Sequence, residues 1–212
     1  MRAVFILVLT LFICGCDTIG GGIKTKKYVY NPKNINNADF QEAIAEYKKG
    51  KIYHAVNLFK KASESGVVQA DYELGTIYFT GQTGRRDYEK AYSYFKKGAA
   101  KKHIPSQYMM GVHNYNGFAT HKNYVEALKF FKESASEGYT PSQYFLARML
   151  YQGNGCAVDY DRAFNWCHKA ALNGNKPAQR FLGFMYMEGK GVAMDKKVGQ
   201  EWVRRSSVPE PN

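Results

Sequence analysis

Residues 70–100 read ADYELGTIYFTGQTGRRDYEKAYSYFKKGAA, and the small residues of this stretch return every 36 positions along the chain. Three series show the period: Gly75, Gly111, Ala147 and Gly183; Gly81, Gly117, Gly153 and Gly189; and Ala91, Ala127, Ala163 and Gly199. A fixed period in this range indicates a stack of identical supersecondary units, none of which can bury its apolar face alone. Stacks of this kind present surfaces to other macromolecules.

Each period contains start and stop signals for two helices. Short polar residues that can accept amide hydrogens of a first turn precede the second helix: Asp87, Asn123, Asp159 and Asp195. Prolines, which fit the first helical position because they lack an N–H, open the first helix: Pro105, Pro141 and Pro177. A glycine able to adopt a positive φ ends it, as at Gly81. Each unit is therefore predicted to be helix, loop and helix.

Small residues inside the predicted helices have a packing role. A side chain no larger than a methyl group lets two helix axes approach to the short end of the range of about 8–10 Å. Gly75 and Gly111 fall on first helices, and Ala91 and Ala127 fall on second helices. The apolar spacing agrees, because one helical face carries Ala70, Leu74, Ile77, Tyr78 and Gly81.

These residues resemble the Sel-one-like repeat, an α/α relative of the tetratricopeptide repeat. The family pattern stands here as Ala70, Tyr72, Leu74-Gly75, Tyr78, Gly81, Ala91, Phe95 and Ala99-Ala100. The resemblance implies an all-α fold, a right-handed α/α solenoid of helix-turn-helix repeats with a 36-residue period. It covers about four fifths of the chain. It specifies a fold more than a function, because such scaffolds serve many partners.

The predicted organisation has five parts. Residues 1–15 are a lipoprotein signal peptide, 16–37 a lipidated cysteine and flexible tether, 38–67 an N-terminal capping unit, 68–207 four Sel-one-like repeats, and 208–212 a tail. The capping unit fits the repeat only in its second half. The tether is rich in Gly, Lys and Asn, a composition that favours a flexible chain.

The N-terminus carries an export signal. Its apolar run, Ala3 to Ile13, is too short for a membrane span and typical of a secretory signal. The end of this run, Ile13-Cys14-Gly15-Cys16, resembles the bacterial lipobox, which implies that Cys16 is acylated; an ordinary signal peptide or an uncleaved anchor is the alternative. We expect a lipid-anchored protein on the periplasmic side of a bacterial membrane. Asp17 resembles the inner-membrane retention signal of enteric bacteria, with the outer membrane as the alternative.

The chain is basic, with 30 Lys and Arg against 18 Asp and Glu and a formal net charge of +12. This excess suits an acidic protein partner, anionic headgroups or acidic cell-wall polymers, or simply a solvated surface beside an anionic membrane. Nucleic acid is not expected as a partner of an exported protein. We expect a monomer that binds another protein.

Two cysteines, Cys156 and Cys167, remain after the N-terminal pair is assigned to the signal. They could pair in an oxidising compartment. A bridge from a loop to a helix can, however, exceed the limit of about 7 Å between Cα atoms. Cys167 also stands where two other repeats have Phe95 and Phe131, so it is predicted to fill the core instead.

The sequence contains no catalytic or cofactor motif of the kinds searched: no Gly-x-Ser-x-Gly, Walker loop, His-Glu-x-x-His or Cys-x-x-Cys. Its five histidines show no metal-ligand spacing, so no catalytic residue, metal or cofactor is expected. His113 and Asn114 stand where another repeat has the apolar pair Ile77-Tyr78. They form either a small polar pocket or a satisfied core hydrogen bond.

A stripe of residues on the first helices is the candidate partner-binding surface. It comprises Tyr72, Phe79, Tyr108, Tyr115, Tyr144, Arg148, Tyr151 and Arg180. The family resemblance implies that first helices line the concave surface, and tyrosine and arginine are typical of interface hot spots. Packing between adjacent repeats is the alternative, with the end at Arg148, Tyr151 and Arg180 expected to be the more open part.

The resemblance and the predicted address favour a non-catalytic, membrane-tethered adaptor for a protein partner. One concrete form is an immunity protein, because small exported lipoproteins of this repeat type resemble those that neutralise type VI secreted effectors such as lipases. A scaffold for envelope or cell-wall assembly is the alternative. A β-lactamase-like enzyme, described among some relatives, is disfavoured because no nucleophile–base pair is found.

Overall fold

The computed structural model describes residue 28 and residues 35–208. These residues form ten α-helices and no strand, which confirms the predicted all-α class. The helices are α1 (Ala38–Lys48), α2 (Ile52–Glu64), α3 (Val68–Thr80), α4 (Tyr88–Ala100), α5 (Ile104–Asn116), α6 (Tyr124–Ser136), α7 (Thr140–Gln152), α8 (Tyr160–Leu172), α9 (Lys176–Glu188) and α10 (Lys196–Ser207). The predicted signal peptide, Cys16 and Asp17 lie outside the described residues.

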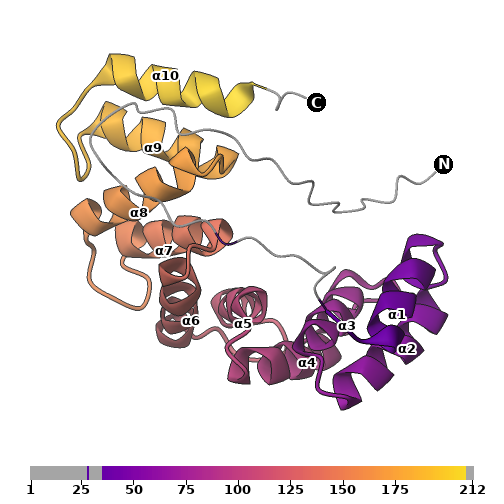
Figure 1. Cartoon of the computed structure of the whole chain (residues 1–212). Helices are drawn as coiled ribbons and strands as arrows, with labels where there is room; N and C mark the ends of the chain where they lie inside the picture. The colour runs from indigo at the N-terminus through magenta and orange to yellow at the C-terminus, as the bar shows by residue number, and fades with distance from the viewer. Residues whose placement is uncertain (1–27, 29–34, 209–212) are drawn as a thin grey trace.

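The helices form a solenoid, because each packs mainly against the helix before it and the helix after it. Figure 1 shows them along an arc from α1 and α2 at one end to α9 and α10 at the other. Odd-numbered helices lie toward the inner side of the arc and even-numbered helices toward the outer side. Within residues 35–208, none of the helices has both the length and the hydropathy that crossing a bilayer requires.

The helix ends form as the sequence predicts. Each predicted cap side chain accepts a hydrogen bond from the backbone N–H three residues later, at Asp87, Asn123, Asp159 and Asp195. The first turns of α5, α7 and α9 contain Pro105, Pro141 and Pro177. The first helices end in left-handed glycines with φ from 67° to 78°, at Gly81, Gly117, Gly153 and Gly189. Local chemistry therefore sets the period.

In two of the repeats, the paired helices meet where a glycine of the first helix faces an aromatic ring of the second. A Cβ atom added to Gly75 would lie 2.5 Å from Cε1 of Phe95. A Cβ atom added to Gly111 would lie 2.6 Å from Cε1 of Phe131. Both rings are fully buried, so they fill space that exists only because the facing helix lacks a side chain there.

The third repeat makes the same contact with a different pair. Ala147 stands in the place of the glycine and Cys167 in the place of the phenylalanine, and both are fully buried. The methyl group that Ala147 adds to the first helix is thus offset by Cys167 on the second helix, whose side chain is smaller than phenylalanine. The Cys167 Sγ lies 3.3 Å from the carbonyl oxygen of Ala178, and burial raises the pKa of this thiol. Cys156 and Cys167 are both free, so Cys167 acts as a core residue.

The pair α1 and α2 covers the N-terminal end of the solenoid. Asn37 caps α1 by accepting from the N–H of Phe40, 2.9 Å away. The buried ring of Phe40 packs against that of Phe59, with centroids 5.7 Å apart. This end of the stack is therefore closed by its own aromatic contact.

Glu46 of α1 holds the turn into α2. Its carboxylate accepts from Lys49 Nζ at 2.7 Å and lies 3.1 Å from Lys51 Nζ and 3.3 Å from His54 Nδ1. These interactions, led by the hydrogen bond from Lys49, lower the pKa of Glu46 from 4.5 to about 2.

Replacing Gly111 with alanine should lower the free energy of unfolding by about 1–3 kcal/mol, because the new methyl group overlaps the enclosed ring of Phe131. Gly111→Leu should abolish the folded stack. Denaturant unfolding followed by circular dichroism measures both. The double variant Gly111→Ala/Phe131→Cys copies the pair Ala147 and Cys167, so its two changes should be less than additive.

The matched control is Ala147→Gly, which removes a methyl group without a clash and should cost no more than about 1 kcal/mol. A stabilising effect of Gly111→Ala would contradict the packing role of this glycine.

The Glu46 cluster predicts a dependence of stability on acid. Because the folded pKa lies below the unfolded value, the cluster stabilises the protein above about pH 4.5, and this contribution is lost as the pH falls toward 2. The difference in melting temperature between wild type and Glu46→Gln should therefore be largest near neutral pH and shrink through this window. Glu64→Gln on α2 is the control, and a Glu46→Gln difference that stays constant with pH would refute the assignment.

Candidate functional site

The predicted stripe belongs to the first helices, which lie toward the inner side of the arc in Figure 1. Its members lie on α3, α5, α7 and α9 and repeat with the period of the stack: Tyr72, Phe79, Tyr108, Tyr115, Tyr144, Arg148, Tyr151 and Arg180. All are partly buried except Arg180, which is exposed. The repeat therefore places these residues in register along the first helices, where the partly buried members also contribute to packing.

Phe79 serves mainly to join two repeats. Its ring lies 5.4 Å from Tyr88 and 6.4 Å from Phe95 of its own repeat, and 5.5 Å from His113 and 5.7 Å from Phe118 of the next. An aromatic ring with four ring neighbours offers little surface to a partner. The packing alternative describes this position better than the binding one.

Tyr151 combines packing with a polar tip. Its ring lies 5.1 Å from that of Phe181 in the next repeat and 5.0 Å from Tyr160. Its hydroxyl donates to Glu188 Oε2 at 2.8 Å. Burial, together with this hydrogen bond, raises the pKa of Tyr151 to about 12, so the phenol stays neutral. Tyr115, one repeat earlier, packs in the same way against Tyr124 at 5.3 Å.

The C-terminal end of the stripe is its most open part. The guanidinium of Arg148 lies 5.7 Å above the ring of Tyr144 and 5.9 Å above that of Phe145. Arg180 is exposed, and Phe184, one turn further along α9, is 46% exposed. An arginine stacked on tyrosine beside an exposed phenylalanine has the composition of an interface hot spot. The binding role of these residues stays a prediction.

The structure adds a tyrosine that the sequence analysis missed. Tyr139, in the loop before α7, lies 5.3 Å from Tyr108 between ring centroids, and its hydroxyl interacts with that of Tyr72. We call Tyr72, Tyr108 and Tyr139 the tyrosine cradle. Tyr28, from the N-terminal segment, lies against it: the rings of Tyr28 and Tyr139 are 5.7 Å apart at 72°.

The position of Tyr139 carried a sequence signal. It is the residue immediately before a first helix, where the other repeats have Val67, His103 and Asn175. The 36-residue period aligns these four positions, and Tyr139 is the tyrosine among them. Nothing in the sequence indicates that Tyr28 lies against it.

Burial controls the charge state of these phenols. It raises the pKa of Tyr72 and that of Tyr108 to about 12, and it also raises the pKa of Tyr139 and of Tyr28. A buried phenol favours its neutral form, because the phenolate would lose its hydration. The tyrosine cradle therefore presents uncharged rings and hydroxyl groups throughout the physiological pH range.

Burial also shifts the titratable groups around the tyrosine cradle toward their neutral forms. The ring of His103 lies 5.5 Å from that of Tyr72, and its Nδ1 lies 2.9 Å from Ser106 Oγ. Burial lowers the pKa of His103 to about 4. Burial raises the pKa of Glu73, while Gln69 donates a hydrogen bond to its carboxyl at 2.7 Å. This part of the inner face therefore suits apolar and neutral polar groups.

His113 and Asn114 lie in different surroundings. His113 is fully buried, and its Nδ1 donates to the carbonyl of Phe118 at 3.0 Å. Its ring also contacts Tyr92 at 5.7 Å, and burial lowers its pKa. Asn114 donates to the carbonyl of Met110 at 2.8 Å and lines a hollow of about 350 Å³ between α4, α5 and α6. A polar pocket thus stays a prediction at Asn114, whereas His113 is a core residue.

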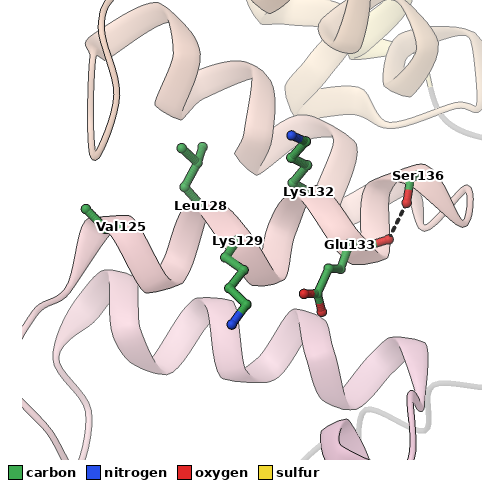
Figure 2. A pocket seen from close by; sticks show the side chains of 6 residues that line it. All are labelled: Val125, Leu128, Lys129, Lys132, Glu133 and Ser136. Atoms are coloured by element: carbon green, nitrogen blue, oxygen red, sulfur yellow. Dashed lines mark hydrogen bonds between the residues drawn. The ribbon is translucent and has the colours of Figure 1, made fainter.

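Basic residues gather on the outer face. The even-numbered helices contain 13 Lys and Arg residues, against four on the odd-numbered helices. Figure 2 shows a hollow of about 520 Å³ whose lining residues all come from α6. Leu128 and Lys132 extend from one side of the helix and Lys129 from the other. A hollow lined by one helix is an open surface, unlike the enclosed clefts that hold small ligands.

No group of three or more His, Cys, Asp or Glu side chains in residues 35–208 is arranged to hold a metal ion.

Replacing His113 with methionine, the residue at the equivalent positions 149 and 185, should flatten the acid dependence of stability. The folded pKa of His113 is lowered, so the unfolded chain binds more protons and stability falls as the pH drops below about 6.5. The variant should lose part of this slope, by at most about 1.4 kcal/mol per pH unit. His103 and His168 act in the same direction and should leave a residual slope.

Urea unfolding between pH 7 and 5 measures this change. His121→Met, at an exposed loop position, is the control. An unchanged slope in His113→Met would show that His113 is not held neutral by the core.

A comparison with protein-family models identifies the family described as Sel1 repeat. The model matches residues 48–67, 68–103, 104–139, 140–175 and 176–207. These segments include α2 to α10 and together span far more than half of the chain. A comparison with curated proteins gives no match.

Solved structures share this architecture. A protective antigen present in uropathogenic Escherichia coli strains, displaying an SLR fold, is 31% identical over 72% of this chain, with a TM-score of 0.68; the match spans 32% of that protein's length. A Sel1 repeat protein from Oxalobacter formigenes is 27% identical over 80% of this chain and 72% of its own, with a TM-score of 0.73. An immunity protein from Pseudomonas aeruginosa is 21% identical over 84% of this chain and 85% of its own, with a TM-score of 0.44, a likeness too loose to bear on function.

Proposed function

Because the chain belongs to the Sel1 repeat family, a family of protein-interaction scaffolds, we propose that it binds a protein partner through the inner face of its solenoid. One observation carries the proposal: the row of tyrosine and arginine side chains at the inner face ends in Arg148, Arg180 and the exposed ring of Phe184. Repeat scaffolds use such extended inner faces to hold other chains.

The charge distribution supports the inner face as the place for specific contacts. Few Lys and Arg side chains lie on the odd-numbered helices, so ring contacts and neutral hydrogen bonds are the contacts that a partner can make there. The basic outer face suits a different role, electrostatic attraction to an anionic surface or an acidic polymer. We therefore assign both roles of the positive charge, attraction to an anionic surface or to an acidic polymer, to the outer side of the arc. We assign partner selection to the inner side.

The mechanism of this proposal is binding without catalysis. Among the described residues the buried histidines are neutral core groups, and the buried thiol of Cys167 has a raised pKa. Burial keeps the Cys167 thiol protonated, whereas the thiolate is the nucleophilic form of cysteine.

The proposed location is the periplasmic side of a bacterial membrane, with Cys16 as the lipid anchor. The support is the N-terminal sequence itself, an apolar run that ends in the lipobox-like residues before Cys16. An anchor of this kind raises the concentration of the scaffold where a membrane-active partner works. The narrower proposal is an immunity protein for an antibacterial effector such as a lipase. A scaffold for envelope or cell-wall assembly is the alternative.

Binding is tested by capture of partners from an envelope extract with the chain from residue 17 onward, which contains every residue that the structure describes. One stoichiometric hydrolase or toxin would support the immunity proposal. Several cell-wall or export proteins would support the envelope scaffold instead.

The variants Tyr144→Ala and Arg148→Glu should each weaken the captured complex by about 1–3 kcal/mol, because they remove the stacked pair at the open part of the stripe. Titration of the purified partner measures the affinity, and circular dichroism checks that helicity is unchanged. Lys132→Glu on α6 makes the same charge reversal on the outer face and should bind normally. Wild-type affinity in both inner-face variants would exclude the inner face as the binding surface.

A further inference from the structure

The tyrosine cradle is already occupied by a residue of the same chain. Tyr28 lies nine residues before the N-cap of α1 in sequence, yet it lies against the loop between α6 and α7. Its backbone N–H donates to the carbonyl oxygen of Gly138 at 3.0 Å, and its ring meets the edge of Tyr139. The hydrogen bond to Gly138 and the ring contact with Tyr139 therefore hold both the main chain and the side chain of Tyr28.

The side chain of Tyr28 is partly buried against the solenoid. Burial raises the pKa of its hydroxyl. Its ring meets the edge of the Tyr139 ring, so the side chain packs against the solenoid at this loop.

Only one junction of the stack provides this combination. The loop before α7 offers a glycine carbonyl at Gly138 followed directly by the aromatic Tyr139. The equivalent residue pairs at the other junctions are Gly66-Val67, Lys102-His103 and Gly174-Asn175, none of which has a tyrosine. Two further rings, from α3 and α5, complete the cradle only because Tyr72 and Tyr108 recur in register with the repeat.

The chemistry of the cradle selects its occupant. Its rings and neutral hydroxyls suit an aromatic side chain with a polar tip, since rings prefer edge-to-face contacts and a buried phenol needs a hydrogen-bonding neighbour. The carbonyl of Gly138 requires a free backbone N–H beside that ring, which an extended peptide segment offers.

We propose that the tyrosine cradle is a binding subsite for a tyrosine side chain on an extended peptide segment, and that Tyr28 is its built-in competitor. A partner that uses this part of the inner face presents such a tyrosine and displaces Tyr28. The inference deepens the proposed function, on which it rests for its biological role. Since Tyr28 is tethered to the solenoid, its effective concentration at the cradle is on the order of millimolar, so it competes even if its intrinsic affinity is weak.

The test uses a fluorescently labelled peptide of residues 24–33, KTKKYVYNPK, added to the chain from residue 17 onward. The variant Tyr28→Ala empties the cradle without touching a helix and should bind the peptide roughly tenfold more tightly than wild type, by fluorescence anisotropy. A peptide with alanine at the position of Tyr28 should lose this binding, although it keeps the second tyrosine. No partner protein is needed, so a failed partner capture leaves this measurement intact.

Two further variants place the peptide on the structure. In the Tyr28→Ala background, Tyr139→Ala should reduce peptide affinity at least about tenfold, as the loss of a hot-spot ring does. Tyr53→Ala, an exposed tyrosine of α2, should not change it. Circular dichroism confirms that each variant is folded.

Equal affinity of the peptide for wild type and Tyr28→Ala would overturn the role of Tyr28 as competitor. No binding to Tyr28→Ala would overturn the subsite. Because Tyr28→Ala lies outside the helices, both outcomes can be read even if Tyr139→Ala proves unstable.

Discussion

The close approach of the two helices within a repeat is the contact on which the rest of the structure depends. Gly75 and Gly111 leave room for the buried rings of Phe95 and Phe131, and the same contact recurs with the period of the chain. Interiors pack at crystal-like density, so the volume missing from one helix must be supplied by the other. In the third repeat the pair Ala147 and Cys167 keeps this balance with both partners changed. The packing therefore constrains the two facing residues together, and it does not fix the residue type at either position by itself.

This packing also decides what the inner face can be. Each repeat is stacked on the next by rings of the first helices, so aromatic side chains are needed there for stability before any partner arrives. Where the ring is enclosed, as at Phe79, it serves the stack. Where the side chain is only partly buried, as at Tyr144 and Tyr151, part of it remains at the surface, where we propose that a partner binds. The same row of residues thus contributes to stability and is proposed to bind a partner. The exposure of each side chain decides which of the two roles it has.

The sequence was a good guide to local features and a poor one to distant contacts. Helix caps, prolines and left-handed glycines act within a few residues of themselves, so their positions predict the helix ends directly. Placing the stripe on one face also followed from the period. The period does not predict which residues of the stripe are enclosed and which are open, because the exposure of a ring depends on side chains from the next repeat. Tyr28 and Tyr139 were missed for the same reason: they are 111 positions apart, and nothing local marks their contact.

What the sequence determined alone is the class of the protein, a stack of helical pairs with its repeat length and its core contacts, because these rest on short-range backbone chemistry and on a period that any repeat must obey. Tertiary structure decided which rings are enclosed, that His113 is a neutral core residue, that the positive charge gathers outside the arc, and that the tyrosine cradle holds Tyr28. These properties depend on curvature and burial, which arise only when successive repeats pack against one another.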